Sequence, residues 1–543
     1  MFTDINIYMV GVFGSIFVYL LIGIYAGRKV KNIEDYYVSG RNATTIFITG
    51  TMFASMLSTN GFMGDTAYAY CGNITTIVLI NSLCACGYIL GPLFFGRYIR
   101  RAESTTMPSY FGSRFNSLRI RRFAGVITII SLSAYFLSVM QGTGILMETL
   151  TELDRGTCLF ISWACIMLFT LYSGSRGVII TDTVMCILFL GATIIAGPYI
   201  FDAAGGIGDL VVNLVKNPNT PESLLSYHGN TGGETILNTV MYGVTMGIVW
   251  MITVSVSPWQ AGRNLMAKNE HVIFRSGAIS AFLTVAFLIY LYLMAISVIT
   301  LNPNMGQPEK VIIWAAYEVM PKMIGMLLLI GIMAAGLSSA STFLSVVSFS
   351  LSNDVLNLNF KNEQSHLAFS RVVLLGVGVL SLILAYLNLS SMRIIAWFAS
   401  TIIAASWGYL AFSSVWCKKI TERGAYYAMV GGFFGYLLSE CLKEFVGLSL
   451  ENFFHPFFIG VFISILGAIL GSSGECRTQE EIDFHEKLHV IPQNEKSSSD
   501  YKIDKAFGWF LIIAGIAVST LLIKYWALPY NGAIGNDVLA IFG

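Results

Sequence analysis

The residues of this sequence whose types and spacing could bind a cation or a polar solute lie inside apolar blocks. The stretch FASMLSTNGFMGDTAYAY places Ser58, Asn60, Gly61 and Asp65 close together in one such block. Because unsatisfied backbone is costly in lipid, this polar run predicts an unwound point in a discontinuous helix. Freed carbonyls at such a break can bind a cation, and the half-helix ends can bind a solute. The alternative interpretation is a face of small residues for close helix packing.

A second polar stretch, IGIMAAGLSSASTFLSVVSFS, carries a group of hydroxyls at one level of another apolar block. Ser338, Ser341 and Thr342 have the i, i+3, i+4 spacing that places side chains on one face of a helix. Hydroxyl oxygens are hard ligands, which suit Na⁺ without a carboxylate. The alternative interpretation is that each hydroxyl bonds to the backbone of its own helix.

Asp182 is an isolated acid near the start of a third apolar block, in GVIITDTVMC. A carboxylate at this depth is costly and is therefore a candidate functional group. At about 1.5 Å per residue, Asp182 lies about 6 Å and Ser338 about 8 Å from the inner face of a hydrocarbon core about 30 Å thick, so the two can meet at one level. The alternative is an aspartate that snorkels to the interface.

Apolar blocks of about 20 residues must position these groups. Of the 543 residues, 55% are apolar or aromatic and 12% are charged, against roughly 25% charged in soluble domains. This composition excludes an ordinary soluble enzyme and a disordered chain. The sequence instead predicts fourteen transmembrane helices. The blocks are 7–27, 44–70, 75–98, 121–147, 156–172, 178–201, 236–258, 273–299, 323–352, 367–387, 389–412, 423–445, 453–473 and 506–528.

The charges of the loops predict the orientation of these helices. Residues 97–122 hold seven arginines and one acid, whereas 202–235 is mainly acidic. Basic loops stay in the cytoplasm, so 97–122 and the long polar segment 474–505 should lie inside and 202–235 outside. The basic residues after the first block, Arg28, Lys29 and Lys31, fit this scheme. Both termini are then expected outside, in a plasma membrane or a bacterial inner membrane.

Several function classes find no support in the sequence. No GxxxxGK[ST] motif occurs, which disfavours ATP as the energy source. The nine cysteines are scattered, without a CxxC pair, which disfavours a structural zinc. His485 and His489 lie four residues apart in a polar stretch, and the expected interpretation is a solvated linker. A membrane-embedded enzyme would need a cluster of His, Glu or Cys at membrane depth, and none is visible.

Four segments together resemble the sodium/solute symporter family, which includes sodium/galactose, sodium/proline, sodium/pantothenate and sodium/sialic acid cotransporters. GRKVKNIEDYYVSGRN resembles the K…DYyxxGR signature, and YSGSRGVIITD resembles the Y…G…xxTD segment. SPWQAGRNLMAKNE resembles the xxQ…QRxLAAK segment, with Gly262 in place of the usual Gln before Arg263. AAGLSSAST resembles the sodium-site helix. The order and spacing of all four match, and the resemblance covers most of residues 1–480.

The resemblance implies an all-α polytopic membrane protein with about 14 transmembrane helices and a LeuT-type core of two inverted five-helix repeats. Core helix 1 would be block 44–70, and core helix 8 would be block 323–352. The expected division is an extra helix and cytoplasmic signature loop at 1–43, the first repeat at 44–201, an extracellular or periplasmic loop at 202–235, the second repeat at 236–412, two additional helices at 413–473, a cytoplasmic linker at 474–505, and a last helix and tail at 506–543.

The resemblance also implies residues for the sites. The sodium site would use backbone oxygens of Ala54 and Leu57 from core helix 1, with the Ala335 carbonyl and the Ser338 and Ser339 hydroxyls from core helix 8. A second sodium site would use Asp182, Ser338, Ser341 and Thr342, so one or two Na⁺ ions are expected. The solute would contact the broken parts of core helices 1 and 6, at Ser58, Asn60, Asp65, Trp250 and Thr253.

Asp65 departs from the family pattern, because the members compared have a neutral residue there. It could pair with an amine, bond to hydroxyls, or lie at a helix end without a ligand. An ionised Asp65 would disfavour a monocarboxylate solute.

The implied function is Na⁺-coupled uptake of a small polar organic solute, such as a sugar, an amino acid or a vitamin-like compound, by alternating access. The alternatives are an H⁺-coupled symporter of the same fold and a membrane sensor that binds solute without transporting it. A passive channel is disfavoured by the broken helices.

Overall fold

The computed structural model describes residues 6–27, 37–224, 236–356, 358, 362–387, 391–450 and 452–534, and the side chains of 172–176, 236, 363 and 533–534 lie outside that description. Arg28, Lys29 and Lys31, the basic residues expected after the first helix, also lie outside it. Within the described part, the long elements are all helices. Backbone exposed to lipid must form its hydrogen bonds within its own segment, which favours helices. The long apolar runs and the small number of prolines allow such helices to form.

The long helices follow the predicted blocks closely. They are α1 (Ile7–Gly27), α3 (Thr45–Thr59), α5 (Ile74–Gly91), α8 (Leu118–Thr151), α9 (Arg155–Ala203), α11 (Ile236–Val256), α13 (Glu270–Ser297), α15 (Lys322–Phe349), α16 (Glu363–Tyr386), α17 (Met392–Trp416), α18 (Glu422–Val446), α19 (Pro456–Ser472) and α21 (Ser498–Leu522). Shorter helices join them: α4 (Thr66–Tyr68), α6 (Arg97–Arg101), α7 (Met107–Arg114), α10 (Leu210–Lys216), α12 (Ala261–Asn264), α14 (Val311–Glu318), α20 (Gln479–His489) and α22 (Leu528–Ile534).

Ten helical segments of the described residues are long and apolar enough to cross a membrane. One of them, Thr45–Arg101, covers two of the predicted spans, and the apolar helices Arg155–Leu171 and Pro456–Ser472 are shorter. The assigned helix α9 contains both blocks 156–172 and 178–201. The count of fourteen spans therefore stays a prediction.

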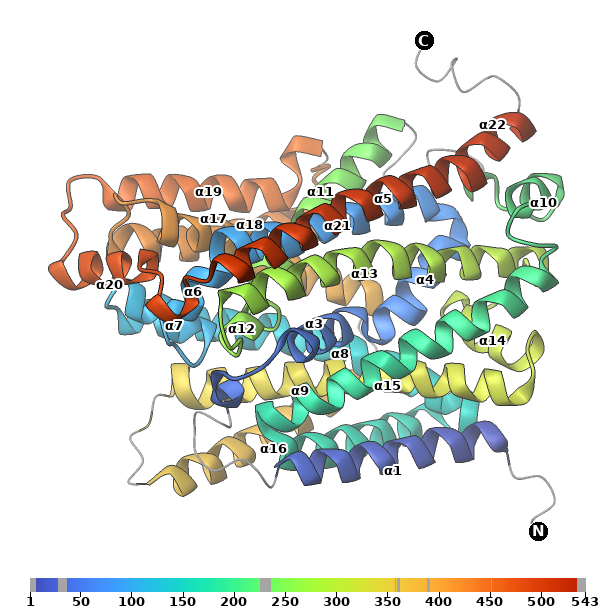
Figure 1. Cartoon of the computed structure of the whole chain (residues 1–543), viewed down its shortest axis with the longest axis horizontal. Coiled ribbons are helices and arrows are strands. Elements are labelled where there is room, and N and C mark those ends of the chain that lie inside the picture. The colour runs from blue at the N-terminus through green and yellow to red at the C-terminus, as the bar shows by residue number, and fades with distance from the viewer. Residues whose placement is uncertain are drawn as a thin grey trace.

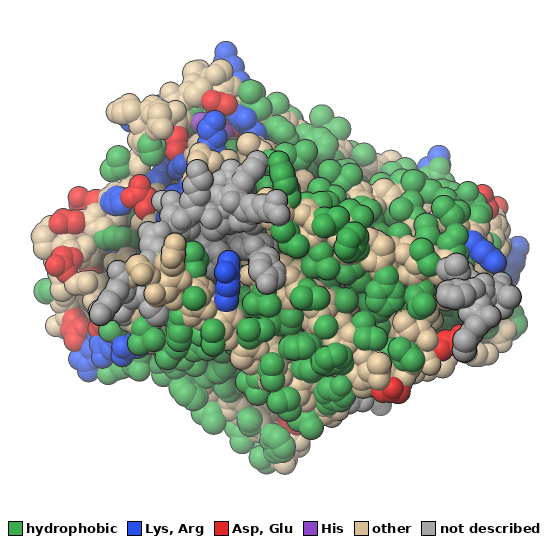
Figure 2. Space-filling view, turned by 90° about the horizontal axis from the view of Figure 1, so that it is seen from below, with side chains coloured by type: hydrophobic (Ala, Val, Ile, Leu, Met, Phe, Trp, Pro, Cys, Tyr) green, Lys and Arg blue, Asp and Glu red, His purple; other side chains and the backbone are tan. Residues whose placement is uncertain are grey.

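The helices lie lengthwise beside one another, along the long axis of the molecule (Figure 1). Helix α3 lies in the interior, where it packs against α9, α13 and α15. Apolar side chains cover most of the middle of the face seen in Figure 2, and charged side chains gather toward its ends. This is the distribution that a bundle surrounded by hydrocarbon requires.

One end of the molecule, called here the basic end, holds α6, α7 and α20. The arginine-rich segment 97–122 meets the beginning of α13 there, through an ion pair of 2.6 Å between Arg101 Nη2 and Glu270 Oε2. Both side chains are buried. Helix α1 begins and α22 ends at the opposite end of the molecule (Figure 1).

Residues 474–505, called here the C-terminal strap, pack against the basic end. Arg100 Nη1 donates to Glu495 Oε1 at 2.7 Å, and the Glu270 backbone N–H donates to Glu495 Oε2 at 3.1 Å. His485 is 5% exposed, and its Nε2 lies 2.8 Å from the Val415 carbonyl oxygen. Burial, together with the nearby Arg114 charge, lowers the pKa of His485 to about 4.

The expectation of a solvated linker is therefore wrong for His485. The polar composition of the strap reflects pairing with charged loops of the basic end, which a local reading of the sequence cannot distinguish from exposure to water.

Candidate functional site

Helix α3 is broken where the polar run predicted an unwound point. Ser58 has φ 49° and ψ −178°, and the π-helical turn Asn60–Asp65 follows it. A positive φ is uncommon for a residue with a side chain and costs about 1–3 kcal/mol. The Ser58 hydroxyl accepts the Asn60 backbone N–H at 3.0 Å, which satisfies one group that the break frees. The break interrupts the helix within a stretch that is buried on both sides of Ser58.

Four of the five predicted sodium ligands converge beside this break. The Ser338 and Ser339 hydroxyls of α15 donate to the Ala54 carbonyl of α3 at 3.1 and 3.2 Å. Ser338 also lies 3.1 Å from the Ala335 carbonyl. Both serines are fully buried. The fifth predicted ligand, Leu57, has a carbonyl that accepts the Asn60 N–H instead.

This set of oxygens fits a small hard cation. Hard cations take carbonyl and hydroxyl oxygens at about 2.3–2.6 Å, and oxygens about 3 Å apart can share one ion at that distance. Each hydroxyl that now donates a proton to a carbonyl can rotate and present its lone pairs instead. The chemistry of the donor set is therefore that of an alkali-ion site without a formal charge of its own.

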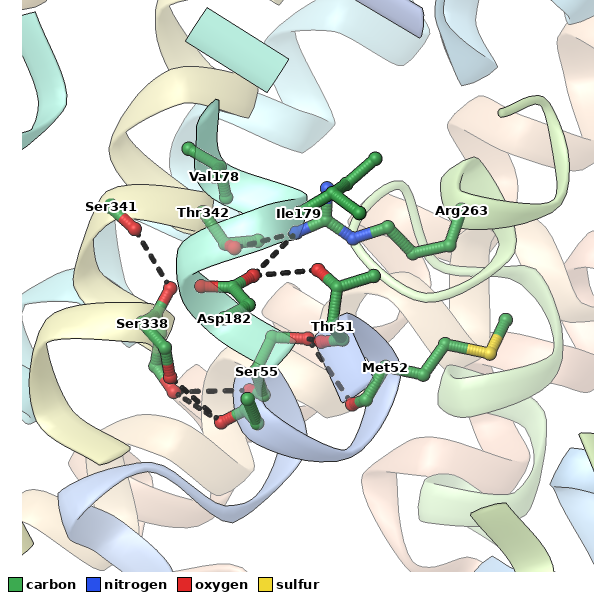
Figure 3. Close-up of polar contacts among 12 residues, drawn as sticks. Thr51, Met52, Ser55, Val178, Ile179, Asp182, Arg263, Ser338, Ser341 and Thr342 are labelled. Carbon is green, nitrogen blue, oxygen red and sulfur yellow. Dashed lines mark hydrogen bonds and ion pairs between the residues drawn. The ribbon is translucent and has the colours of Figure 1, made fainter. Parts of the chain in front are cut away.

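Asp182 lies close to this set and is fully buried, so the snorkelling interpretation is wrong. The Thr51 hydroxyl donates to Asp182 Oδ2 at 2.6 Å, and Arg263 Nη2 lies 3.8 Å from the same oxygen (Figure 3). The Arg263 guanidinium also donates to the Thr342 hydroxyl at 2.6 Å. The arginine thus supplies the positive charge that a buried carboxylate requires. The second carboxylate oxygen, Oδ1, has no hydrogen-bond partner.

The predicted second sodium set is brought together only in part. Thr342 contacts both Asp182 and Arg263, whereas the Ser341 hydroxyl donates to the Ser338 carbonyl of its own helix at 3.0 Å. Arg263 lies in one of the motifs of the family resemblance, but the sequence pattern gave no indication that it pairs with Asp182. The side chains of 172–176, which begin the YSGSRGVIITD segment, lie outside the described residues.

Close packing of α3 against α9 brings Thr51 to Asp182. A Cβ placed on Gly50 would stand 2.6 Å from Thr183 Oγ1 and 2.8 Å from Thr183 Cα. The second of these atoms is backbone, which cannot turn aside. Gly50 therefore sets the distance between the two helices that carry the Thr51–Asp182 hydrogen bond.

A cluster of aromatic rings lies beside the break, where Tyr135 of α8 has a hydrogen bond with the Ser58 side chain. Tyr135 stacks on Phe343 with ring centroids 4.4 Å apart, and it meets Trp250 at 6.1 Å and Trp259 at 5.6 Å. Trp250 was predicted as a solute residue, and Tyr135 was missed because an aromatic ring in an apolar block is ordinarily core. The predicted Thr253 hydroxyl donates to the Ser400 carbonyl at 3.0 Å and is directed toward α17.

Asp65 lies beyond the break, among polar and aromatic groups of three other helices. The Tyr292 hydroxyl donates to Asp65 Oδ2 at 3.5 Å. The Arg393 guanidinium lies over Tyr68 and Trp397, at 3.8 and 4.4 Å from the ring centroids. Sequence reasoning missed Arg393, although a lone arginine inside the apolar block 389–412 was a signal that could have found it.

A discontinuous helix in a membrane bundle, with ligand groups of a neighbouring helix beside the break, is typical of secondary transporters. The solved structure of a Na⁺-coupled sialic acid symporter, in a substrate-bound outward-open state, matches with a TM-score of 0.71 and 19% identity, over 87% of this chain and 99% of that one. A nucleobase-cation-symport-1 family transporter matches with a TM-score of 0.54 and 10% identity, over 83% of this chain and 98% of that one. The expected LeuT-type core is confirmed.

The sequence comparisons give the family. The model of the sodium:solute symporter family matches residues 36–432, and the chain belongs to this family. A high-affinity proline transporter of Bacillus subtilis is 23% identical over 82% of this chain and 95% of its own length. The sodium/proline and sodium/pantothenate symporters of Escherichia coli are 25% and 23% identical, over 89% and 86% of this chain and 97% and 94% of their own lengths. The protein is a sodium-coupled solute transporter and not an enzyme.

Proposed function

We propose that one Na⁺ binds between the break of α3 and the hydroxyls of α15, and that this ion couples the sodium gradient to solute uptake. The observation that carries the proposal is the convergence of the Ser338 and Ser339 hydroxyls on the Ala54 carbonyl, beside the distorted Ser58. The ligands are Ala54, Ala335, Ser338 and Ser339, and the Leu57 carbonyl joins them when Asn60 releases it.

The ion acts by joining two elements that otherwise meet through a few hydrogen bonds. A cation bound by both α3 and α15 favours the conformation in which these two helices are in contact. It does so because it binds that conformation more tightly than one in which the helices are apart. Movement of one charge through the membrane contributes about 2.3 kcal/mol per 100 mV. Na⁺ entering with the solute thus supplies the free energy for accumulation.

The solute site that the geometry supports lies next to this ion. Tyr135 and Trp250 offer apolar ring faces, and Ser58 and Asn60 offer polar groups at the break. A small polar organic solute that stacks on the rings and bonds to the break would lie between α3, α8 and α11. The named relatives carry proline and pantothenate, and solutes of that size are the class proposed here.

Asp182 and Arg263 are proposed to mark the route by which Na⁺ leaves. A cavity reaches Arg263 of this pair, with Tyr37, Met107, Thr342 and Phe349 also among its lining residues. Because Arg263 already balances Asp182, a second resident Na⁺ is not required, and the unpartnered carboxylate oxygen attracts the departing ion. Asp182→Asn should slow Na⁺ release and lower the turnover rate about tenfold or more, while uptake keeps first-order dependence on Na⁺.

The basic end is proposed to be cytoplasmic, because seven arginines lie in segment 97–122. The beginning of α1 and the end of α22 then lie outside. Cysteine labelling with an impermeant reagent from either side of the membrane would test this orientation.

The proposed coupling is tested in proteoliposomes with an imposed Na⁺ gradient. Concentrative uptake should require Na⁺ outside and should be abolished when K⁺ replaces Na⁺ at constant pH. Equal uptake in K⁺, or uptake driven by a pH gradient alone, would overturn Na⁺ coupling. Binding without accumulation would favour a sensor.

A further inference from the structure

Three buried polar atoms at the outer side of the break lack hydrogen-bond partners. They are Asn60 Oδ1, Asp65 Oδ1 and Arg393 Nη1. The Arg393 charge acts on the Asp65 carboxylate, yet these atoms remain unpaired. A buried donor or acceptor without a partner costs about 1–3 kcal/mol, and more when it is charged. Unpartnered atoms on a negatively and a positively charged side chain in the same region indicate a ligand that forms hydrogen bonds with both.

The position of each charge is fixed by its neighbours. The Arg393 guanidinium lies 3.8 Å from the Tyr68 centroid and 4.4 Å from the Trp397 centroid. Contact with two aromatic faces orients the planar guanidinium. The guanidinium also has a hydrogen bond with the Tyr242 side chain, and its Nη1 remains without a partner. An arginine oriented in this way can donate from Nη1 to the carboxylate of a ligand in a charge-assisted hydrogen bond.

The acid is held by a separate chain of hydrogen bonds. Asn81 Nδ2 donates to the Tyr292 hydroxyl at 2.6 Å, and this hydroxyl donates to Asp65 Oδ2 at 3.5 Å. Asn60 presents its side-chain oxygen nearby, because a Cβ on Gly64 would stand 2.4 Å from Asn60 Oδ1 and 3.6 Å from Arg393 Cβ. Two acceptor oxygens without partners, from Asp65 and Asn60, suit an ammonium group.

This group of residues lies away from the basic end. Asp65 follows the break at Ser58 by seven residues, or about 10 Å of helix. Arg393 is the second residue of α17, and the last residue of α17, Trp416, donates to the Phe94 carbonyl just before α6 at 2.8 Å. A solute that enters from the side opposite the basic end therefore meets Asp65 and Arg393 before it meets the aromatic rings at Tyr135.

We propose that Asp65 and Arg393 form an outer recognition site for zwitterionic solutes, in which Asp65 binds an ammonium group and Arg393 binds a carboxylate. The inference rests on the proposed transport function and names its solute class as small amino acids or similar compounds. A solute with one charge would leave either Asp65 Oδ1 or Arg393 Nη1 without a hydrogen-bond partner. A site that forms hydrogen bonds with a polar group of its ligand strongly rejects analogues that lack this group.

The test is a Na⁺-dependent uptake screen in proteoliposomes with the proteinogenic amino acids, their amides, and their 2-hydroxy acid counterparts. Wild-type protein should prefer an amino acid to both analogues by at least about tenfold in kcat/KM. In Asp65→Asn the preference over the hydroxy acid should collapse, and in Arg393→Gln the preference over the amide should collapse. Each variant should keep the preference that the other loses, which a merely structural defect would not produce.

Controls separate the outcomes. Glu318→Gln and Lys322→Gln remove exposed charges near the beginning of α15 and should change neither preference. Asp65→Glu and Arg393→Lys keep the charges and should retain the discrimination in part. Accumulation of a neutral sugar with no amino acid preference would overturn the outer site and leave Na⁺ coupling standing. Absence of Na⁺-dependent uptake for every solute would instead overturn the proposed function.

Discussion

Replacement of Ser339 by Ala tests the sodium site most directly. The Ser339 hydroxyl lies 3.2 Å from the Ala54 carbonyl oxygen and 3.3 Å from the Ser55 carbonyl oxygen, in a fully buried position. A hydrogen-bonding group on a charged partner contributes about 1.5–3 kcal/mol. Loss of this oxygen as a ligand should therefore raise the Na⁺ concentration for half-maximal uptake about 10–150-fold, since 1.4 kcal/mol is tenfold.

The effect on folding should be much smaller. Ser338 still donates to the Ala54 carbonyl in the variant, so this buried oxygen keeps one partner, and one neutral hydrogen bond contributes about 1 kcal/mol. The assay is solute uptake at saturating solute over a range of Na⁺, with thermal stability measured in parallel. Ser406→Ala is the matched control, because Ser406 is equally buried and bonds only to the Ile402 carbonyl of its own helix. An unchanged Na⁺ dependence in Ser339→Ala would refute the assignment.

Three further perturbations follow from the packing and the charges. Gly50→Val should push α3 from the Thr183 backbone, cost about 1–3 kcal/mol, and lower both the melting temperature and uptake. Glu270→Gln leaves the Arg101 charge buried without its partner, so a loss of about 3–5 kcal/mol is expected in thermal unfolding; a shift as small as that of a surface substitution would contradict this. Because the pKa of His485 falls from 6.5 to about 4 on folding, the unfolded chain binds more protons between these values. Stability should fall as pH drops through this window, and His485→Gln should flatten that dependence.

The sequence predicted the parts of the site that depend on local pattern. The break near Ser58 followed from a polar run in an apolar block, and the hydroxyls of α15 followed from helical spacing. A fold and a sodium set could then be inferred from the resemblance. Tertiary pairing was not predictable, because the partner of a buried charge is chosen by three-dimensional packing. Arg263 beside Asp182 and Arg393 beyond Asp65 both illustrate this limit.

The C-terminal strap shows a related limit of prediction from sequence. Polar composition alone does not distinguish a solvent-exposed segment from one whose polar groups are paired with the rest of the protein. His485 has the sequence surroundings of a linker and the burial of a core residue. Its Nε2 contacts the Val415 carbonyl, and the charge of Arg114, hundreds of positions earlier in the chain, also acts on it.

The packing of the strap has a genetic consequence. A premature stop codon shortly after position 473 would spare nearly every helix of the core, yet it would leave Arg100 without Glu495 and would strip the cover from the adjoining loops. Such an allele should behave as a loss of function through faulty assembly and degradation. A reporter protein fused to the C-terminus of such a truncated chain would then report misfolded protein rather than active transporter.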